Sequence, residues 1–386
     1  MAGPYRILVV DDEVDVEPLV LQRMRREVRN GIYEFLFAHN GVEALEILNA
    51  DENIDMVLSD INMPEMDGLT LLQQIPSVNP NIRSVIVSAY GDMKNIRVAM
   101  NRGAFDFITK PIDFEDLKIT IGRTVQHLKM WREALQARDR LISLQNELGI
   151  AKEMQQSILP SGFPSDRRYE VFGAMEPARD VGGDFFDIMR LTDSLTGIAI
   201  ADVSDKGVPA ALFMMSSRTL LKGAATGGLR PSEALQEINM MLSDDNDAGM
   251  FVTVCYAIYD LETGMLSYSN GGHNAPMLVR ADGGAELIEM PPGIALGVWL
   301  EADFGDRALQ LNPGDLVFFY TDGVTEAMNE ADEEFGEARL LELGAAAAGM
   351  DPQQICQTVI DAVREFAGDA PQSDDITCAA LKRELP

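Results

Sequence analysis

The sequence has few of the residues that build disulfide scaffolds or soft metal sites. Its three cysteines, Cys255, Cys356 and Cys378, include no closely spaced pair, which argues against a disulfide framework or a zinc knuckle. It also has only three histidines, too few for a histidine-rich metal centre. We therefore expect a protein of a reducing compartment whose chemistry is carried by carboxylates.

Long apolar runs and an excess of basic residues are also missing. No stretch approaches the roughly 18 apolar residues that a membrane span needs, so we expect a soluble, cytoplasmic protein. The 62 acidic residues outnumber the 31 basic ones, and the formal net charge of −31 opposes binding to polyanions. We expect no partner that is a nucleic acid or a membrane.

What is present is enough for several folded domains, since 386 residues predict two or three of them. Residues 1–116 alternate five short β-rich runs with helical stretches, which predicts an α/β domain with a doubly wound, five-stranded parallel sheet. From about residue 160, alternating strands such as 251–259 and 316–320 are interspersed with helical windows such as 209–225. This second pattern predicts an α+β sandwich.

Residues 117–158 link these two regions and contain no proline. Seam-compatible residues recur there at three- and four-residue spacing with one slip near Arg138, namely Leu117, Ile121, Thr124, Leu128, Trp131, Leu135, Leu141, Leu144, Leu148, Ala151 and Ile158. We predict one long helix that forms a parallel coiled-coil homodimer. The alternative is a lone amphipathic helix lying on a domain.

Polar residues stand where the strands of the first region end. Asp11 and Asp12 end the first strand, Asp60 the third and Ser88 the fourth, and Lys110 follows the fifth. Ligands of open parallel sheets bind at this edge. Three carboxylates in one crevice repel one another and favour a hard divalent cation such as Mg²⁺. With that cation, a carboxylate can accept a phosphoryl group whose oxygens bind the lysine and the hydroxyl.

The segments LVVDDE, LSDINMPEMDG, VSAYGD and AFDFITKP resemble the receiver domain of two-component response regulators over about residues 5–125. The resemblance implies that Asp60 receives a phosphoryl group from a sensor histidine kinase or a phosphotransfer protein. Ser88 and Lys110 would bind the phosphoryl oxygens, and Phe107 would be the aromatic switch. The implied Mg²⁺ ligands are Asp11, Asp12, Asp60 and the carbonyl of Asn62.

Four more aspartates flank apolar strands of the second region: Asp184, Asp202, Asp322 and Asp374. Each alone is typical of a turn. Together, from separated strands, they supply the oxygen ligands that two hard divalent cations need. Such a site suits phosphoryl hydrolysis without a histidine or cysteine nucleophile.

The segments RDVGGDFFD, IADVSDKG, FFYTDGVTEA and SDDIT, with the lead-in helix at 147–160, resemble the PPM family of metal-dependent serine/threonine phosphatases. The likeness is to the bacterial branch that includes SpoIIE and RsbU, over about residues 150–383. It implies a β-sandwich flanked by helices that binds two Mn²⁺ or Mg²⁺ ions. The implied metal ligands are Asp202 as the bridge, the Val203 carbonyl, Asp184, Asp322, Asp374 and, as a secondary candidate, Asp375.

Three residues of the second region keep two interpretations each. Asp205 either tolerates a left-handed backbone or adds a metal carboxylate. His273 either orders a turn or takes part in catalysis. Arg179 either holds substrate phosphate or is solvated. No residue is assigned as the leaving-group acid, because Ser204 stands where eukaryotic relatives have histidine.

These patterns predict a receiver domain (1–125), a helical connector (117–158) and a phosphatase domain (159–386), with phosphorylation of Asp60 controlling the phosphatase. By resemblance, the substrate is a phosphorylated STAS-type anti-sigma factor antagonist in sigma-factor partner switching. The alternative is a non-enzymatic adaptor that binds a sigma or anti-sigma partner. The presence of all four aspartates argues for activity.

Overall fold

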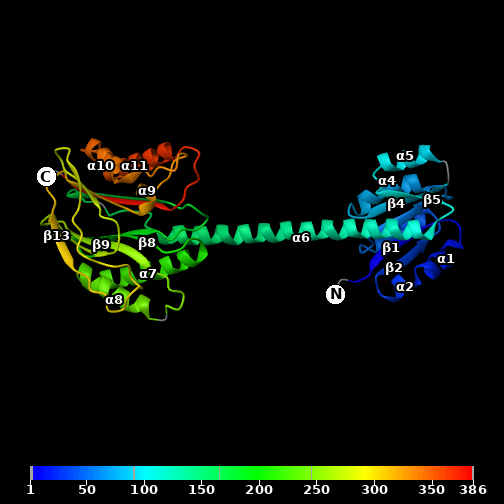
Figure 1. Cartoon of the computed structure of the whole chain (residues 1–386), viewed down its shortest axis with the longest axis horizontal. Coiled ribbons are helices and arrows are strands. Elements are labelled where there is room, and N and C mark those ends of the chain that lie inside the picture. The colour runs from blue at the N-terminus through cyan, green and yellow to red at the C-terminus, as the bar shows by residue number, and fades with distance from the viewer. Residues whose placement is uncertain (1–2, 90–91, 165, 245, 385–386) are drawn as a thin grey trace. The chain divides into compact units, whose positions relative to one another are not determined.

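The computed structural model describes residues 3–89, 92–164, 166–244 and 246–384 (Figure 1). Tyr90 and Gly91, which belong to the predicted receiver segment VSAYGD, lie outside the described residues. The chain forms two compact units, residues 1–143 and 144–386, and the division falls inside one continuous helix, α6 (Phe114–Ile158).

The first unit is a parallel sheet with helices on both faces, and its strand order is β2-β1-β3-β4-β5. Its elements are β1 (Tyr5–Val10), α1 (Val16–Arg23), α2 (Arg25–Arg29), β2 (Tyr33–Ala38), α3 (Gly41–Ala50), β3 (Met56–Asp60), α4 (Gly68–Val78), β4 (Arg83–Ala89), α5 (Met93–Asn101) and β5 (Asp106–Lys110). Alternate residues of β1 face opposite cores: Ile7 packs with α1 and α6, and Leu8 packs with α3 and α4. The predicted doubly wound fold is confirmed.

Helix α6 begins as part of this first core. Leu117, Ile121, Thr124 and Leu128 are each at most 2% exposed. These four positions of the predicted dimer seam therefore form the receiver's own packing face, as the alternative of a helix lying on a domain requires. Farther along, Leu141 is 61% exposed. A coiled coil thus stays a prediction only for the part of α6 that follows the receiver core.

The second unit has four layers, with helices outside two stacked antiparallel sheets of order β13-β10-β9-β8-β7 and β12-β11-β14-β15-β6 (Figure 1). Its strands are β6 (Tyr169–Glu176), β7 (Phe185–Arg190), β8 (Leu195–Val203), β9 (Val252–Asp260), β10 (Met265–Gly271), β11 (Met277–Val279), β12 (Ala285–Leu287), β13 (Asp306–Gln310), β14 (Leu316–Tyr320) and β15 (Ile376–Arg383). Its helices, besides the end of α6, are α7 (Val208–Thr226), α8 (Pro231–Ser243), α9 (Asp322–Thr325), α10 (Gly336–Ala346) and α11 (Pro352–Ala367).

Three apolar cores hold the four layers together. The inner faces of the two sheets meet in one core, where Ile200 and Tyr259 of one sheet pack with Val317 and Phe319 of the other. Helices α7 and α8 cover the outer face of the first sheet, and α10 and α11 cover the outer face of the second. All three cysteines are buried and unpaired. The predicted helix-flanked sandwich is confirmed.

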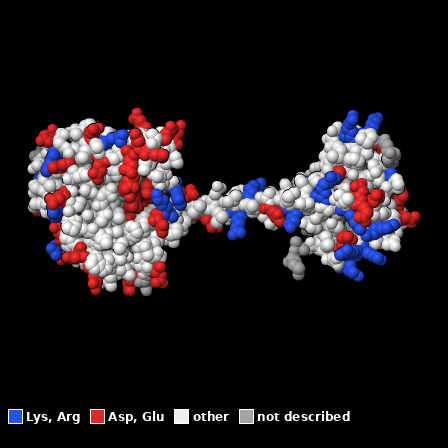
Figure 2. Space-filling model, in the orientation of Figure 1, with Lys and Arg blue, Asp and Glu red and all other residues white. Residues whose placement is uncertain are grey.

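None of the helices in the described ranges is both long and apolar enough to cross a membrane. Figure 2 shows acidic side chains outnumbering basic ones on the visible face of the second unit, in keeping with the acidic composition.

Candidate functional site

The first unit gathers carboxylates where parallel strands end. Because Val10 of β1 is paired with Ser59 of β3, the residues that follow or end these strands meet at one edge. Oxygen atoms of Asp11, Asp12 and Asp60 all lie within 4.8 Å of one another. Asp11 and Asp60 are buried, whereas Asp12 is exposed. This geometry fits one hard divalent cation.

Lys110 is the counter-charge of this cluster. Its Nζ lies 2.7 Å from Asp60 Oδ2 and 3.0 Å from Asp11 Oδ2, and it also reaches Glu13 Oε1 at 3.2 Å. Burial lowers the pKa of Lys110, but its bonds to Asp60 and Asp11 outweigh burial and leave that pKa above its usual value. Burial is also the main reason that the pKa of Asp11 is raised. The lysine therefore stays charged beside the predicted phosphoacceptor.

The remaining predicted receiver residues lie around this cluster. Ser88 is fully buried, and β-pairing places it beside Thr109, next to Lys110. Its Oγ lies 3.5 Å from Asp92 Oδ2. Asn62 is exposed just after β3, and Phe107 is partly buried in β5. Their roles as phosphoryl ligand, Mg²⁺ ligand and switch stay predictions.

The aspartates of the second unit come from both of its sheets. Asp184 directly precedes β7 and Asp202 lies near the end of β8, in a pair where Phe185 faces Ala201. Asp322 and Asp374 flank β14 and β15, where Tyr320 faces Cys378. Thr321 Oγ1 joins the two pairs by donating to Asp184 Oδ2 at 2.7 Å. The topology therefore brings the four predicted ligands to one edge of the sandwich.

The electrostatics of this second cluster reflect repulsion in a buried place. Burial, together with the charge of Asp322, raises the pKa of Asp202 to about 7. Burial, together with the charge of Asp374, raises the pKa of Asp322 to about 6. Burial, together with the charge of Asp202, raises the pKa of Asp184 well above its usual value. Such groups ionise readily only when cations compensate them.

The donor set of the second cluster suits divalent cations. Asp322 Oδ1 is buried and has no hydrogen-bond partner among the described residues, as expected of an atom that binds a metal. Asp184, Asp202, Asp322 and Asp374 offer only hard oxygen atoms, so they would hold Mg²⁺ or Mn²⁺. Divalent cations bound there would activate water and compensate phosphoryl charge.

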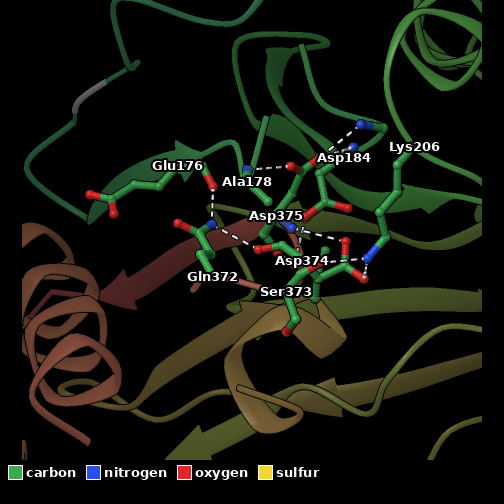
Figure 3. Close-up of polar contacts among 10 residues, drawn as sticks. Glu176, Ala178, Asp184, Lys206, Gln372, Ser373, Asp374 and Asp375 are labelled. Carbon is green, nitrogen blue, oxygen red and sulfur yellow. Dashed lines mark hydrogen bonds and ion pairs between the residues drawn. The ribbon is translucent and has the colours of Figure 1, made fainter. Parts of the chain in front are cut away.

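Asp375 has a clear local role in the structure. Its Oδ1 accepts from the Ala178 N–H at 2.8 Å, and its Oδ2 accepts from the N–H groups of Gly183 and Asp184 at 2.7 and 3.3 Å (Figure 3). These bonds fix the loop that carries Asp184. Asp375 as a metal ligand stays a prediction, as does the Val203 carbonyl at the buried end of β8.

Lys206 and Thr321 are site residues that the sequence did not reveal. Lys206 Nζ lies 2.8 Å from Asp374 Oδ2 and donates to the Ser373 carbonyl at 2.6 Å (Figure 3). Thr321 fixes one oxygen of Asp184, as described above. Lysine and threonine beside Asp–Gly turns are common, so position in the sequence alone gave no signal for either.

His273 ties the two sheets together. Its Nε2–H donates to the Tyr320 carbonyl at 3.1 Å, so Nδ1 accepts from Thr253 Oγ1 at 2.8 Å. Burial lowers the pKa of His273 to about 4. Both ring nitrogens are therefore occupied and the ring is neutral at pH 7, which favours the structural interpretation.

The other two residues with open roles lie at the rim. Asp205 adopts φ of 68°, in the left-handed region, as the first of its two interpretations predicts. Arg179 is exposed, and its Nη1 lies 4.0 Å from where a Cβ on Gly207 would be. This places the guanidinium beside the loop that follows Asp202.

Comparison with known proteins agrees with this description. Residues 7–122 match the response regulator receiver domain, and residues 192–384 match stage II sporulation protein E (SpoIIE). IcfG of Synechocystis sp. is 29% identical over 264 residues, which cover 61% of this chain and 41% of IcfG. The phosphoserine phosphatase RsbU of Bacillus subtilis is 27% identical over 244 residues, which cover 63% of this chain and 71% of RsbU.

A solved structure supports the same fold. The RsbU and RsbW domains of a Mycobacterium tuberculosis protein match with a TM-score of 0.54 and 27% identity, covering 59% of this chain and 63% of that one. This chain spans less than half the length of IcfG. The two units are thus a response regulator receiver domain and a phosphatase domain of the PPM type. The chain belongs to the SpoIIE family, whose model matches half of its length.

Proposed function

We propose that phosphorylation of Asp60 controls a metal-dependent protein serine/threonine phosphatase in the second unit. The observation that carries the proposal is the convergence of Asp184, Asp202, Asp322 and Asp374 from two sheets, with pKa values raised in three of them. Membership of the SpoIIE family and similarity to the phosphoserine phosphatase RsbU support it. The receiver domain supplies the input.

The chain's own residues divide the work. Thr321 and the amides bound by Asp375 orient Asp184. Arg179, exposed beside the loop that follows Asp202, is our candidate for holding substrate phosphate. His273 links the two sheets through its hydrogen bonds, and its neutral ring does not serve as the acid that protonates a leaving group at neutral pH. The substrate in this proposal is a phosphorylated STAS-type anti-sigma factor antagonist. The phosphoryl donor to Asp60 is a sensor histidine kinase or a phosphotransfer protein. The chain forms a homodimer through the exposed part of α6.

Turnover of para-nitrophenyl phosphate and of a phosphorylated STAS-type protein by the full chain with Mn²⁺ or Mg²⁺ tests the enzyme. The Asp202→Ala variant should lose about 10³-fold or more. The matched control is Asp193→Ala, at the opposite end of the β7–β8 pair, where the side chain is fully exposed. Equal background turnover by wild type and Asp202→Ala would instead leave the non-enzymatic adaptor.

Beryllofluoride, which mimics an aspartyl phosphate, tests the switch. We expect it to change the turnover of wild type and to leave that of Asp60→Ala unchanged. An identical response of the two proteins would refute control through Asp60.

A further inference from the structure

The last turn of α6 buries a polar side chain where most of the helix is exposed. Gln155 is 4% exposed, although Met154 is 58% exposed and Gln156 is also exposed. A buried amide is costly unless its donor and acceptor are both used. Gln155 uses both on one residue: its Nε2 donates to the Gly182 carbonyl at 2.6 Å, and its Oε1 accepts from the Gly182 N–H at 3.0 Å.

Gly182 belongs to the loop that carries Asp184, and that loop has little slack. A Cβ on Gly182 would lie 2.3 Å from Asp375 Oδ2 and 2.6 Å from Met175 Cε. The same Asp375 oxygen accepts from the N–H groups of Gly183 and Asp184. The loop backbone is therefore held between Gln155 on one side and Asp375 on the other, so a displacement of Gln155 must shift the loop.

We propose that Gln155 is a positioning residue that couples the last turn of α6 to the metal carboxylate Asp184. This inference rests on the proposed function, in which the receiver controls the phosphatase. Helix α6 is the candidate link, because it begins in the receiver core and ends at this contact. A shift or rotation of the last turn would move Gly182 and with it Asp184, and so change the affinity of the site for its cations. Coupling of this kind is reciprocal for binding free energies.

The test compares Gln155→Met, which keeps the length of the side chain and removes both hydrogen bonds, with Gln156→Met on the exposed face of the same turn. Binding of Mn²⁺ to the full chain is measured from the free-Mn²⁺ signal in electron paramagnetic resonance, alongside thermal unfolding. We expect the affinity of Gln155→Met for Mn²⁺ to fall about tenfold, as for the loss of roughly two hydrogen bonds, and that of Gln156→Met to match wild type. In Gln155→Met, beryllofluoride should also change turnover less.

If Gln155 has a purely structural role, Gln155→Met should unfold at a lower temperature, while the folded variant binds Mn²⁺ as tightly as Gln156→Met does. That result would overturn the inference. If Gln155→Met does not fold, hydrogen exchange of wild type decides. Amides of residues 178–184 should exchange at a different rate when beryllofluoride is added to wild type, and should not respond to it in Asp60→Ala. Unchanged exchange in a wild type whose turnover does respond also overturns it. Absence of wild-type turnover refutes the proposed function, whereas the Mn²⁺ comparison still tests Gln155.

Discussion

The receiver and the phosphatase domain both gather aspartates at the ends of strands, but they neutralise them differently. In the receiver, Lys110 bonds to Asp60 and Asp11 and brings a permanent positive charge into the cluster. In the phosphatase domain, Asp202 and Asp322 repel their neighbours, and Lys206 reaches only Asp374 among the four predicted ligands. The first cluster is therefore partly compensated by the chain itself, whereas the second depends on its cations.

Removal of divalent cations should give the largest difference in stability change between the two domains. At a cation concentration of 100 times the dissociation constant, chelation should cost the phosphatase domain about 2.7 kcal/mol, or roughly 5–10 °C in its unfolding temperature. The receiver should lose less, because Lys110 remains. Differential scanning calorimetry with and without chelator measures both transitions. Equal shifts would contradict the comparison.

Glycines test a feature that the two sites share. A Cβ on Gly68 would lie 2.0 Å from the Asp60 carbonyl oxygen, and one on Gly323 would lie 2.0 Å from the Asp375 carbonyl oxygen. Gly68→Ala and Gly323→Ala should therefore each destabilise their own domain by about 2 kcal/mol. The control is Gly122→Ala on α6, because a Cβ at that position would meet no atom within 4 Å. Gly103 also has open space around it but is not used, because its φ is positive. Urea unfolding measures the stability of each variant. If either site variant is as stable as Gly122→Ala, the backbone next to that glycine moves away from the added Cβ at little cost, and the prediction is wrong.

The pH dependence of the metal-free phosphatase domain should reveal the repulsion. An unfolded aspartate loses its proton near pH 4, whereas folded Asp202 keeps it to about pH 7. Stability contributed by this group is therefore lost as pH rises through that interval. Between about pH 5 and about pH 8, wild type should lose about 2 kcal/mol more than Asp202→Asn. Urea unfolding with chelator at each pH measures this difference. If the stability of wild type and of Asp202→Asn changes with pH in parallel, the pKa of Asp202 is not raised.

Replacement of the two site lysines should separate the two clusters, and Lys206 should give the smallest effect of all. The Lys110 side chain is 22% exposed and pairs with buried carboxylates, so Lys110→Met should destabilise the receiver by about 2 kcal/mol. The Lys206 side chain is 38% exposed, so Lys206→Met should change phosphatase stability by about 0.5 kcal/mol or less. Thermal unfolding in the presence of Mg²⁺ measures both. A larger loss for Lys206→Met would mean that the second cluster also relies on a lysine.

The sequence predicted the parts of this molecule that local patterns encode. Alternating strands and helices predicted both folds, and carboxylates at strand ends predicted that Asp11, Asp12 and Asp60 lie together. Contacts between distant segments gave no such pattern: Gln155 bonds to a residue 27 positions away, and Thr321 to one 137 positions away. The early seam positions of α6 were misassigned to a dimer because a helix packed on a sheet and a helix in a coiled coil share nearly the same periodicity.

The buried cysteines have a practical consequence. Cys255, Cys356 and Cys378 all lie in apolar cores, and burial raises the pKa of Cys255 to about 12, so its reactive thiolate is scarce. The native protein therefore presents little background to thiol reagents. A single cysteine introduced on the exposed stretch of α6 would accept a fluorophore or spin label selectively, which makes the chain suited to following the helix spectroscopically without first removing its own thiols.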